Sequence, residues 1–199
     1  MIVLVKTTCG KFAEVFDRPT VCKSALKFRY PYQEEIKEKV EQFDSFILTS
    51  PRAVKAIEKS GKRFEGETAY VVGPKTAEAA RSIGLDPIGQ DSGNSKELAK
   101  IVEGSPLFLC SNRRQDTIPN RTNCKEQFAY ETVVKESVET PDDASSVVFF
   151  SPSATEAVDT TGDFKTAAIG PTTASHRENP DAVAERPEPK SLKEAILSA

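Results

Sequence analysis

The chain has 199 residues, with 27 Lys and Arg against 30 Asp and Glu, so its net charge is −3. Apolar residues make up 38% and charged residues 29%, a balance typical of a globular protein of one large or two small domains. The chain lacks the surplus of positive charge that nucleic-acid binding requires. Its apolar runs are too short to cross a bilayer. We therefore expect neither a nucleic acid nor a membrane as partner.

The rarer residues exclude several kinds of site. Cys9, Cys22, Cys110 and Cys124 form no C-x-x-C pair and are too few for a disulfide framework, so we expect reduced thiols and a cytoplasmic location. The single histidine, His176, lies among polar residues, which favours a surface position over a catalytic base. No group of side chains has metal-ligand spacing, and no phosphate-binding glycine motif occurs. We expect no metal and no cofactor.

The predicted elements begin with an apolar strand at residues 1–7. A stretch of β-prone aromatic residues follows at 25–32, and a helix is predicted over 34–43 because its apolar residues recur on one face. Residues 106–112 form another apolar strand, and a second β-prone stretch covers 128–136. The two β-prone stretches are candidates for a hinge between lobes.

An internal repeat occupies much of the remaining chain. Residues 47–57 (ILTSPRAVKAI) align with 148–158 (VFFSPSATEAV), and residues 72–77 (VGPKTA) align with 169–174 (IGPTTA). In both copies a short strand ends at Ser-Pro or Gly-Pro and a helical pattern follows, which suits a serine cap and a proline in the first turn. Strands that alternate with helices predict a parallel sheet covered on both faces.

The ends of the two copies predict the domain organisation. The first copy is followed by its own strand at 106–112, whereas the second copy ends the chain and lacks one. The strand at the N-terminus can fill that place. We therefore expect one discontinuous α/β lobe formed by residues 1–27 and 136–199, and an inserted α/β lobe formed by residues 28–135.

Ligands of doubly wound sheets bind beyond the carboxyl ends of the strands. The loops predicted there combine hydroxyls, amides and a few basic side chains with helix starts, a combination that favours anions. Any one of these loops is equally explained as a helix cap, but their number on one edge favours a cleft between two lobes that binds carboxylates or phosphates. The candidate binding residues in these loops are Thr49, Ser50, Arg52, Thr76, Asn94, Ser95, Asn112, Arg113, Ser151, Thr172 and Thr173.

Six strings follow one another along the chain: ILTSPRAVKAI (47–57), VVGPKTAEAARSIGL (71–85), GNSKELAKI (93–101), AYETV (129–133), FFSPSATEA (149–157) and AAIGPTTA (167–174). In this order they resemble the uroporphyrinogen-III synthase family from about residue 46 to the end. The resemblance implies two flavodoxin-like, doubly wound parallel-sheet lobes joined by a two-stranded β ladder. It implies a cofactor-free hydro-lyase of tetrapyrrole and haem biosynthesis, with its active site between the lobes.

The resemblance also implies a substrate and residue roles. The substrate would be hydroxymethylbilane, a linear tetrapyrrole with eight carboxylates, which loses its terminal hydroxyl as water. It closes through a spiro intermediate to uroporphyrinogen III, with ring D inverted. Tyr130 would assist departure of the hydroxyl as an acid or hydrogen-bond donor. The threonine and serine loops would bind acetate and propionate groups, and positive charge would come from Arg52, Arg113, Lys6 and Lys165.

Two other hypotheses remain open. The alternative to the enzyme is a non-catalytic tetrapyrrole- or anion-binding protein on the same scaffold. The short segment between Val158 and Phe164 favours it, because a trimmed lobe can keep the fold without supporting turnover. A two-lobed sensor or a receiver-type interaction module is the third. A phospho-accepting receiver needs clustered aspartates after its first strand, and residues 6–9 (KTTC) offer none. For the synthase we expect a monomer whose partner is its small-molecule substrate, a linear tetrapyrrole polycarboxylate.

Overall fold

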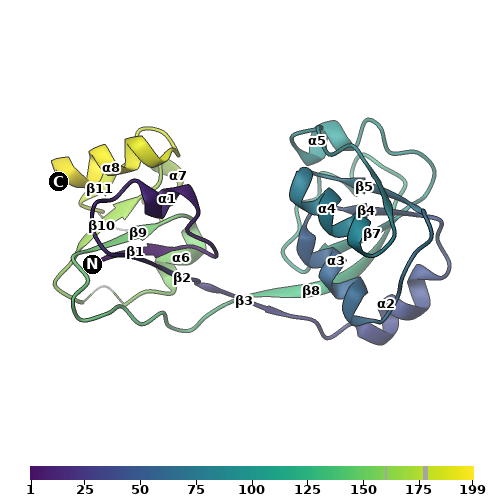
Figure 1. The fold of residues 1–199 in the computed structure, drawn as a ribbon, viewed down its shortest axis with the longest axis horizontal. Coiled ribbons are helices and arrows are strands. Elements are labelled where there is room, and N and C mark those ends of the chain that lie inside the picture. Colours follow the sequence, from purple (N-terminus) through teal and green to yellow (C-terminus); the bar gives the residue numbers. More distant parts are fainter. Residues whose placement is uncertain (160, 177–178) are drawn as a thin grey trace. The chain divides into compact units, whose positions relative to one another are not determined.

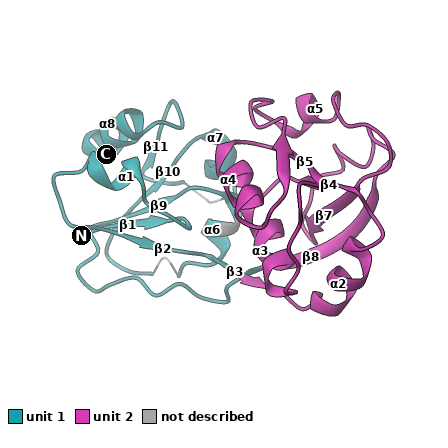
Figure 2. Cartoon of the chain, turned by 45° about the vertical axis from the view of Figure 1, so that its right-hand side comes forward, with its two compact units in different colours: residues 1–27, 133–199 teal, residues 28–132 magenta. Residues whose placement is uncertain are grey.

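The computed structural model describes residues 1–159, 161–176 and 179–199 and, at Ser153, the backbone. The chain divides into two compact units, one formed by residues 1–27 and 133–199 and the other by residues 28–132 (Figure 2). Each unit is built on a sheet whose described strand pairs are parallel, and helices connect the strands (Figure 1). The α/β class with parallel sheets is therefore confirmed.

The sheet of the first unit has five strands in the order β11-β10-β9-β1-β2. Numbered along the chain within this unit, the order is 2-1-3-4-5, one of the common doubly wound orders. The N-terminal strand lies beside the first strand of the second repeat copy, with Leu4 opposite Val148, which is the neighbour that the sequence predicts. The strands are β1 (Ile2–Val5), β2 (Thr20–Lys23), β9 (Ser146–Phe149), β10 (Lys165–Ala168) and β11 (Ala182–Val183).

A six-stranded sheet, in the order β3-β8-β7-β4-β5-β6, belongs mainly to the second unit. Within the unit, the strands from β4 to β8 follow the order 3-2-1-4-5, the other common doubly wound order. The chain passes from one unit to the other within β3 and again within β8. The strands are β3 (Leu26–Arg29), β4 (Ser45–Leu48), β5 (Thr68–Val71), β6 (Asp86–Ile88), β7 (Leu107–Ser111) and β8 (Lys125–Val134).

The central strands β4, β5 and β7 of the second unit are mainly apolar because both faces of the sheet are buried there. On β4, Phe46 and Leu48 pack against helices α2, α3 and α4. Ile47 points to the opposite face and packs with Leu98 of α5 and with Ile118. The helices of this unit are α2 (Gln33–Val40), α3 (Pro51–Lys59), α4 (Pro74–Ser82) and α5 (Ser95–Leu98).

Glycines end the two longest helices of this unit. Gly61 follows α3 and Gly84 follows α4, both with positive φ, 79° and 91° respectively. A Cβ at Gly84 would also clash with the carbonyl oxygen of Phe64. Both the left-handed backbone and the close approach therefore require glycine there.

The first unit has less helix around its sheet. Val3, Val5 and Phe149 pack on one face with Ala157 and Val158. The other face, which includes Leu4 and Val148, is covered by side chains from α1 and α8. The helices are α1 (Lys11–Glu14), α6 (Pro152–Glu156), α7 (Pro171–Ala174) and α8 (Pro189–Ser198). No helix in the described ranges has the length and apolar character needed to cross a membrane.

Two of the cysteines correct the sequence analysis. Cys9 and Cys22 form a disulfide, with Cα atoms 5.6 Å apart, so the expectation of four reduced thiols is wrong for this pair. Cys9 lies in the loop after β1, and Cys22 lies on β2 opposite Leu4. Parallel pairing of these strands brings the two cysteines together, and their spacing in the sequence does not signal it. The argument from reduced thiols to a cytoplasmic location therefore fails.

Cys110 and Cys124 are free. Cys110 is buried on β7, and its desolvation, followed by the nearby Glu126 carboxylate, raises the pKa of the thiol to about 12. A thiol with such a pKa is almost fully protonated at neutral pH and is a poor nucleophile. Cys110 therefore serves packing rather than chemistry.

Candidate functional site

The second unit has a pocket of about 330 Å³ at the point where its strand order reverses, between β4 and β7. Such a switch point is where doubly wound sheets bind ligands, because the loops after the two strands diverge there. We name it the Tyr130 pocket. It is lined by Thr49, Ser50, Ser95, Phe108, Ser111, Arg113, Arg114, Gln115, Ile118, Tyr130 and Thr132.

Tyr130 lies on β8 with 8% of its surface exposed. A register shift makes Ser111 pair with Tyr130 although the preceding Cys110 pairs with Phe128, and irregularities of this kind re-aim side chains at sheet edges. The Tyr130 ring lies 6.3 Å from the rings of both Phe28 and Tyr30. Its hydroxyl makes no hydrogen bond to another residue in the described part of the chain. Tyr130 is thus a fixed ring with a free polar end beside the pocket.

A hydrogen-bond network next to Tyr130 was missed by the sequence analysis. The Ser111 and Thr132 hydroxyls lie 3.0 Å apart, and the backbone N–H of Thr132 donates to Asn112 Oδ1 at 2.8 Å. Ser111 Oγ also donates to Asn112 Oδ1 at 3.1 Å. Thr132 follows Tyr130 by two positions on a strand, so the period-two rule could have placed both side chains on one face. Asn112 itself lines no described pocket, and its oxygen orders the loop.

The two adjacent arginines of this loop have different surroundings. Arg114 donates to Glu126 and, at 2.7 Å, to Asp116. Arg113 forms no ion pair within the described residues and lines the Tyr130 pocket. The sequence analysis selected Arg113, and the structure leaves this guanidinium unneutralised at the pocket.

Two other predicted residues of this unit do not line a described pocket. The Arg52 guanidinium stacks on the Phe28 ring, with its central carbon 3.8 Å from the ring centroid. Thr76 is 2% exposed in the first turn of α4. Direct contact of Arg52 and Thr76 with a ligand stays a prediction.

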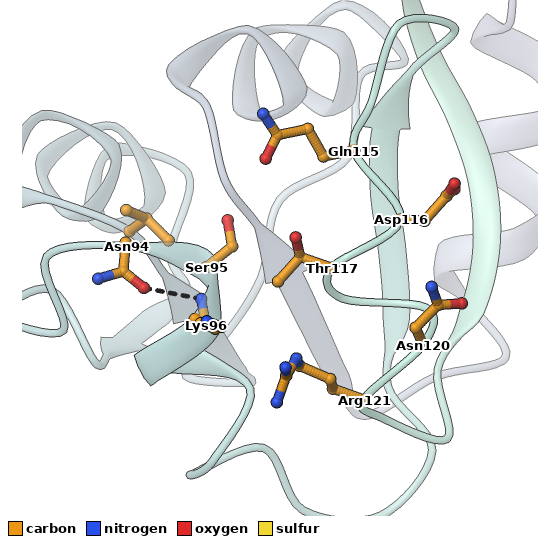
Figure 3. Close-up of a pocket in the computed structure, with 9 residues that line it drawn as sticks. Asn94, Ser95, Lys96, Gln115, Asp116, Thr117, Asn120 and Arg121 are labelled. Atoms are coloured by element: carbon orange, nitrogen blue, oxygen red, sulfur yellow. Dashed lines mark hydrogen bonds between the residues drawn. The ribbon is translucent and has the colours of Figure 1, made fainter.

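A larger pocket of about 920 Å³ lies beside the Tyr130 pocket and shares Ser95 and Gln115 with it. We name it the Arg121 pocket. One wall contains Asn94, Ser95 and Lys96 and the other contains residues from the loop after β7 (Figure 3). Asn94 caps α5, since its Oδ1 accepts from the backbone N–H of Lys96 at 2.9 Å and of Glu97 at 3.1 Å. Ser95 lines the Tyr130 pocket together with Thr49 and Ser50, whereas Asn94 lines only the Arg121 pocket; contact of these residues with a ligand stays a prediction.

The first unit also has a pocket at its switch point, between β1 and β9. This pocket of about 230 Å³ is lined on one side by Lys6, Thr7 and Thr8 and on the other by Phe150 and Ser151. The Lys6 ammonium lies 4.4 Å from the centroid of the Phe150 ring. Burial, and then repulsion from Lys11, lowers the pKa of Lys6.

The two predicted threonines of the first unit lie near α7. Thr173 is 4% exposed, and Thr172 is exposed, with its carbonyl oxygen 2.9 Å from Nδ1 of His176. His176 is itself exposed, as expected. Neither threonine lines a described pocket, so their contact with a ligand stays a prediction.

The structure corrects the predicted placement of Lys165 among the binding loops. It is the first residue of β10 and lies opposite Ser146 at the start of β9, whereas the predicted binding loops follow the ends of these strands. Because the strands are parallel, Lys165 lies at the amino edge of the sheet. It lines a different pocket there with Ser145 and Lys193. Lys165 therefore does not supply charge to the loops at the carboxyl edge.

The described residues contain no group of three or more His, Cys, Asp or Glu side chains placed to hold a metal ion. Hydroxyls, carboxamides and unneutralised cations surround the pockets at the carboxyl edges instead. Such groups bind carboxylates and phosphates through charge-assisted hydrogen bonds. The arrangement defines an α/β protein with a polar pocket at the switch point of each of its two units.

Comparison with known proteins gives the family. The family model described as "Uroporphyrinogen-III synthase HemD" matches residues 3–194. The chain therefore belongs to the uroporphyrinogen-III synthase family, and the resemblance found in the sequence is confirmed.

Individual relatives agree with this assignment. The uroporphyrinogen-III synthase of Saccharomyces cerevisiae is 30% identical over 75% of this chain and 74% of its own. The enzyme of the same name from Schizosaccharomyces pombe is 25% identical over 93% of this chain and 89% of its own. The crystal structure of the uroporphyrinogen-III synthetase from Helicobacter pylori is similar in fold. It has a TM-score of 0.70 at 18% identity and covers 99% of this chain and 98% of its own.

Proposed function

We propose that this protein is a uroporphyrinogen-III synthase that closes hydroxymethylbilane to uroporphyrinogen III with inversion of ring D and loss of water. Family membership supports the activity. One observation in the structure carries the proposal. The Tyr130 hydroxyl makes no hydrogen bond within the described residues, and it lies beside a switch-point pocket lined with hydroxyls and Arg113.

Tyr130 would act on the leaving group. Its O–H can donate to the terminal hydroxyl of the substrate, so that the carbon–oxygen bond breaks as water forms. The substituted carbon of ring D then forms a bond with the carbon left behind and gives the spiro intermediate. A positioned donor of this kind typically contributes about 10²–10⁴-fold to the rate. The rest of the rate enhancement would come from holding the flexible substrate in one geometry. The entropy cost of bringing its two ends together is then met by binding.

The polar loops would hold the substrate carboxylates. Ser50, Thr49 and Thr132 offer hydroxyls in the Tyr130 pocket, and Arg113 offers charge. Ser151 and Lys6 would do the same in the first unit. The finer expectations also stand as part of this proposal: two flavodoxin-like lobes, a two-stranded β ladder made by β3 and β8, a monomer, and a cytoplasmic location.

The test is an isomer analysis. The protein is supplied with hydroxymethylbilane, and the oxidised products are separated into types I and III. Without a catalyst the substrate closes to type I, so we expect type III from the wild-type protein. Type I alone, at the background rate, would overturn the proposal.

A substitution at Tyr130 tests the assigned role. Tyr130→Phe keeps the ring but removes the donor, so we expect kcat to fall about 10²-fold with little change in KM. Tyr70→Phe is the matched control, because the Tyr70 hydroxyl instead accepts from the backbone N–H of Glu103 at 3.2 Å and lines neither pocket. Equal kcat in Tyr130→Phe and wild type would remove Tyr130 from the role.

The second candidate is a non-catalytic tetrapyrrole-binding protein. It is favoured by the shortness of α6 and α7, with five and four residues. Tight binding of a tetrapyrrole polycarboxylate without any type III product would select this candidate over the enzyme.

A further inference from the structure

The Arg121 pocket continues the Tyr130 pocket along the carboxyl edge of the second unit. Ser95 and Gln115 line both. The Tyr130 pocket has a volume of about 330 Å³ and the Arg121 pocket about 920 Å³. A ligand with its reacting end beside Tyr130 and more than one ring in its body can therefore extend past Ser95 and Gln115 into the larger space.

The Arg121 pocket has two cations that nothing in the described residues neutralises. Neither the Lys96 ammonium nor the Arg121 guanidinium forms a described ion pair. The acidic side chain of the lining, Asp116, is paired with Arg114 at 2.7 Å. Glu97, next to Lys96 in the chain, is paired with Lys100 at 2.7 Å. The pocket thus presents net positive charge although the whole chain is acidic.

Donors from the wall after β7 project across the pocket. Figure 3 shows the Arg121 guanidinium and the Gln115 carboxamide projecting toward the wall that contains Asn94 and Lys96, while the Asp116 carboxylate points away from that wall. Because Asn94 Oδ1 is used as a helix cap, the free atom of this side chain is its NH₂ group. The groups left to meet a ligand are therefore mainly donors, as a carboxylate requires.

We infer that the Arg121 pocket is a carboxylate subsite, in which Lys96 and Arg121 bind the acetate and propionate groups of a pyrrole ring remote from the reacting carbon. This inference rests on the proposed function, since it takes the substrate of the Tyr130 pocket to be a linear polycarboxylate. The subsite holds substrate and transition state alike, because the remote ring changes little during ring closure. Its loss therefore raises KM and leaves kcat nearly unchanged.

The experiment uses Lys96→Met, Arg121→Met and the double variant, which keep an unbranched apolar stem and remove the charge. Lys125→Met and Arg81→Met are matched controls with the same change in net charge. Lys125 begins β8 at the amino edge of the sheet, and Arg81 lies in the last turn of α4; both are exposed and line neither pocket. We expect KM for hydroxymethylbilane to rise about tenfold in each single variant and further in the double variant, with kcat within about twofold and KM unchanged in the controls.

A binding measurement separates this subsite from the proposed activity. The same variants are titrated with uroporphyrin III, a stable octacarboxylate tetrapyrrole, by following its fluorescence. A similar loss of affinity in Lys96→Met and Arg121→Met supports the subsite even if the wild type makes no type III product. Unchanged KM and unchanged porphyrin affinity in the double variant would overturn the subsite, while type III product from the wild type would leave the proposed function standing.

Discussion

The two repeat copies use the same element order with different amounts of helix. In the second unit β4, α3, β5 and α4 follow one another, and in the first unit β9, α6, β10 and α7 do so. Helices α3 and α4 have nine residues each, whereas α6 and α7 have five and four. Both copies nevertheless place a pocket at the switch point of their sheet. The strands and the loops that follow them are thus sufficient for a polar pocket, and the helices vary with the packing that each unit needs.

The Ser-Pro motif shows the same difference at one position. The Ser50 hydroxyl accepts from the backbone N–H of Arg52 at 3.2 Å and caps α3. Ser151 occupies the corresponding place before α6, yet its side chain makes no cap hydrogen bond. The same motif therefore caps a long helix in the second unit, where the Ser50 O–H can still donate to a ligand, whereas the Ser151 hydroxyl of the first unit has no capping role.

The largest expected difference between the copies is the stability that each loses when a corresponding core residue is truncated. Ile57 of α3 is fully buried, and its counterpart Val158 after α6 is 6% exposed. We expect Ile57→Ala to lower the free energy of unfolding by about 3–4 kcal/mol and Val158→Ala by about 1–2 kcal/mol. Urea unfolding followed by circular dichroism measures both. The tyrosines (Tyr30, Tyr32, Tyr70 and Tyr130) all lie in residues 28–132, so tyrosine fluorescence reports the second unit by itself. Equal losses in the two variants would contradict the difference in packing.

We expect the disulfide to add stability to the first unit and so to offset the smaller contribution of its short helices. It closes a loop between residues 13 positions apart, and such a cross-link stabilises a protein by about 3 kcal/mol. We expect the double variant Cys9→Ala, Cys22→Ala to increase hydrogen exchange in peptides that cover β1 and β9. Exchange in β4 and β5 should change less. Cys110→Ala is unsuitable as a control because it opens a cavity, so Cys124→Ala serves instead. Unchanged exchange in β1 would show that the cross-link does not support this sheet.

The smallest expected effect separates the two serines. Ser50→Ala removes a helix cap and should cost about 1 kcal/mol of stability. Ser151→Ala removes no cap and should leave the urea midpoint unchanged within error. Ser50→Asp is the matched rescue, because its carboxylate can accept the same backbone N–H. If both alanine variants lost the same stability, Ser151 would also be a cap, and its availability to the pocket would be in doubt.

Local patterns predicted the elements well where they repeat. The apolar strands, the proline-led helices after them and the glycines at the ends of α3 and α4 follow from short stretches of sequence. The pocket residues Thr49, Ser50 and Arg113 were found because each lies at the end of a predicted strand, and Ser95 because it lies at a predicted helix start. Gln115 was missed, since nothing in its local sequence marks it. Thr132 was also missed, although its spacing of two from Tyr130 on a strand could have revealed it. Lys165 was misplaced, because a resemblance gave its role without saying at which end of a strand it lies.

The sequence by itself determined the class, the repeat and the family, because strand, turn and cap preferences act over a few residues and survive in both copies. The tertiary structure alone decided which side chains meet. Pairing of β1 with β2 joined Cys9 to Cys22, and a register shift on β8 placed Tyr130 opposite Ser111. The side-by-side placement of the start of α5 and the loop after β7 depends on contacts between residues far apart in the chain, for which no local pattern carries a signal.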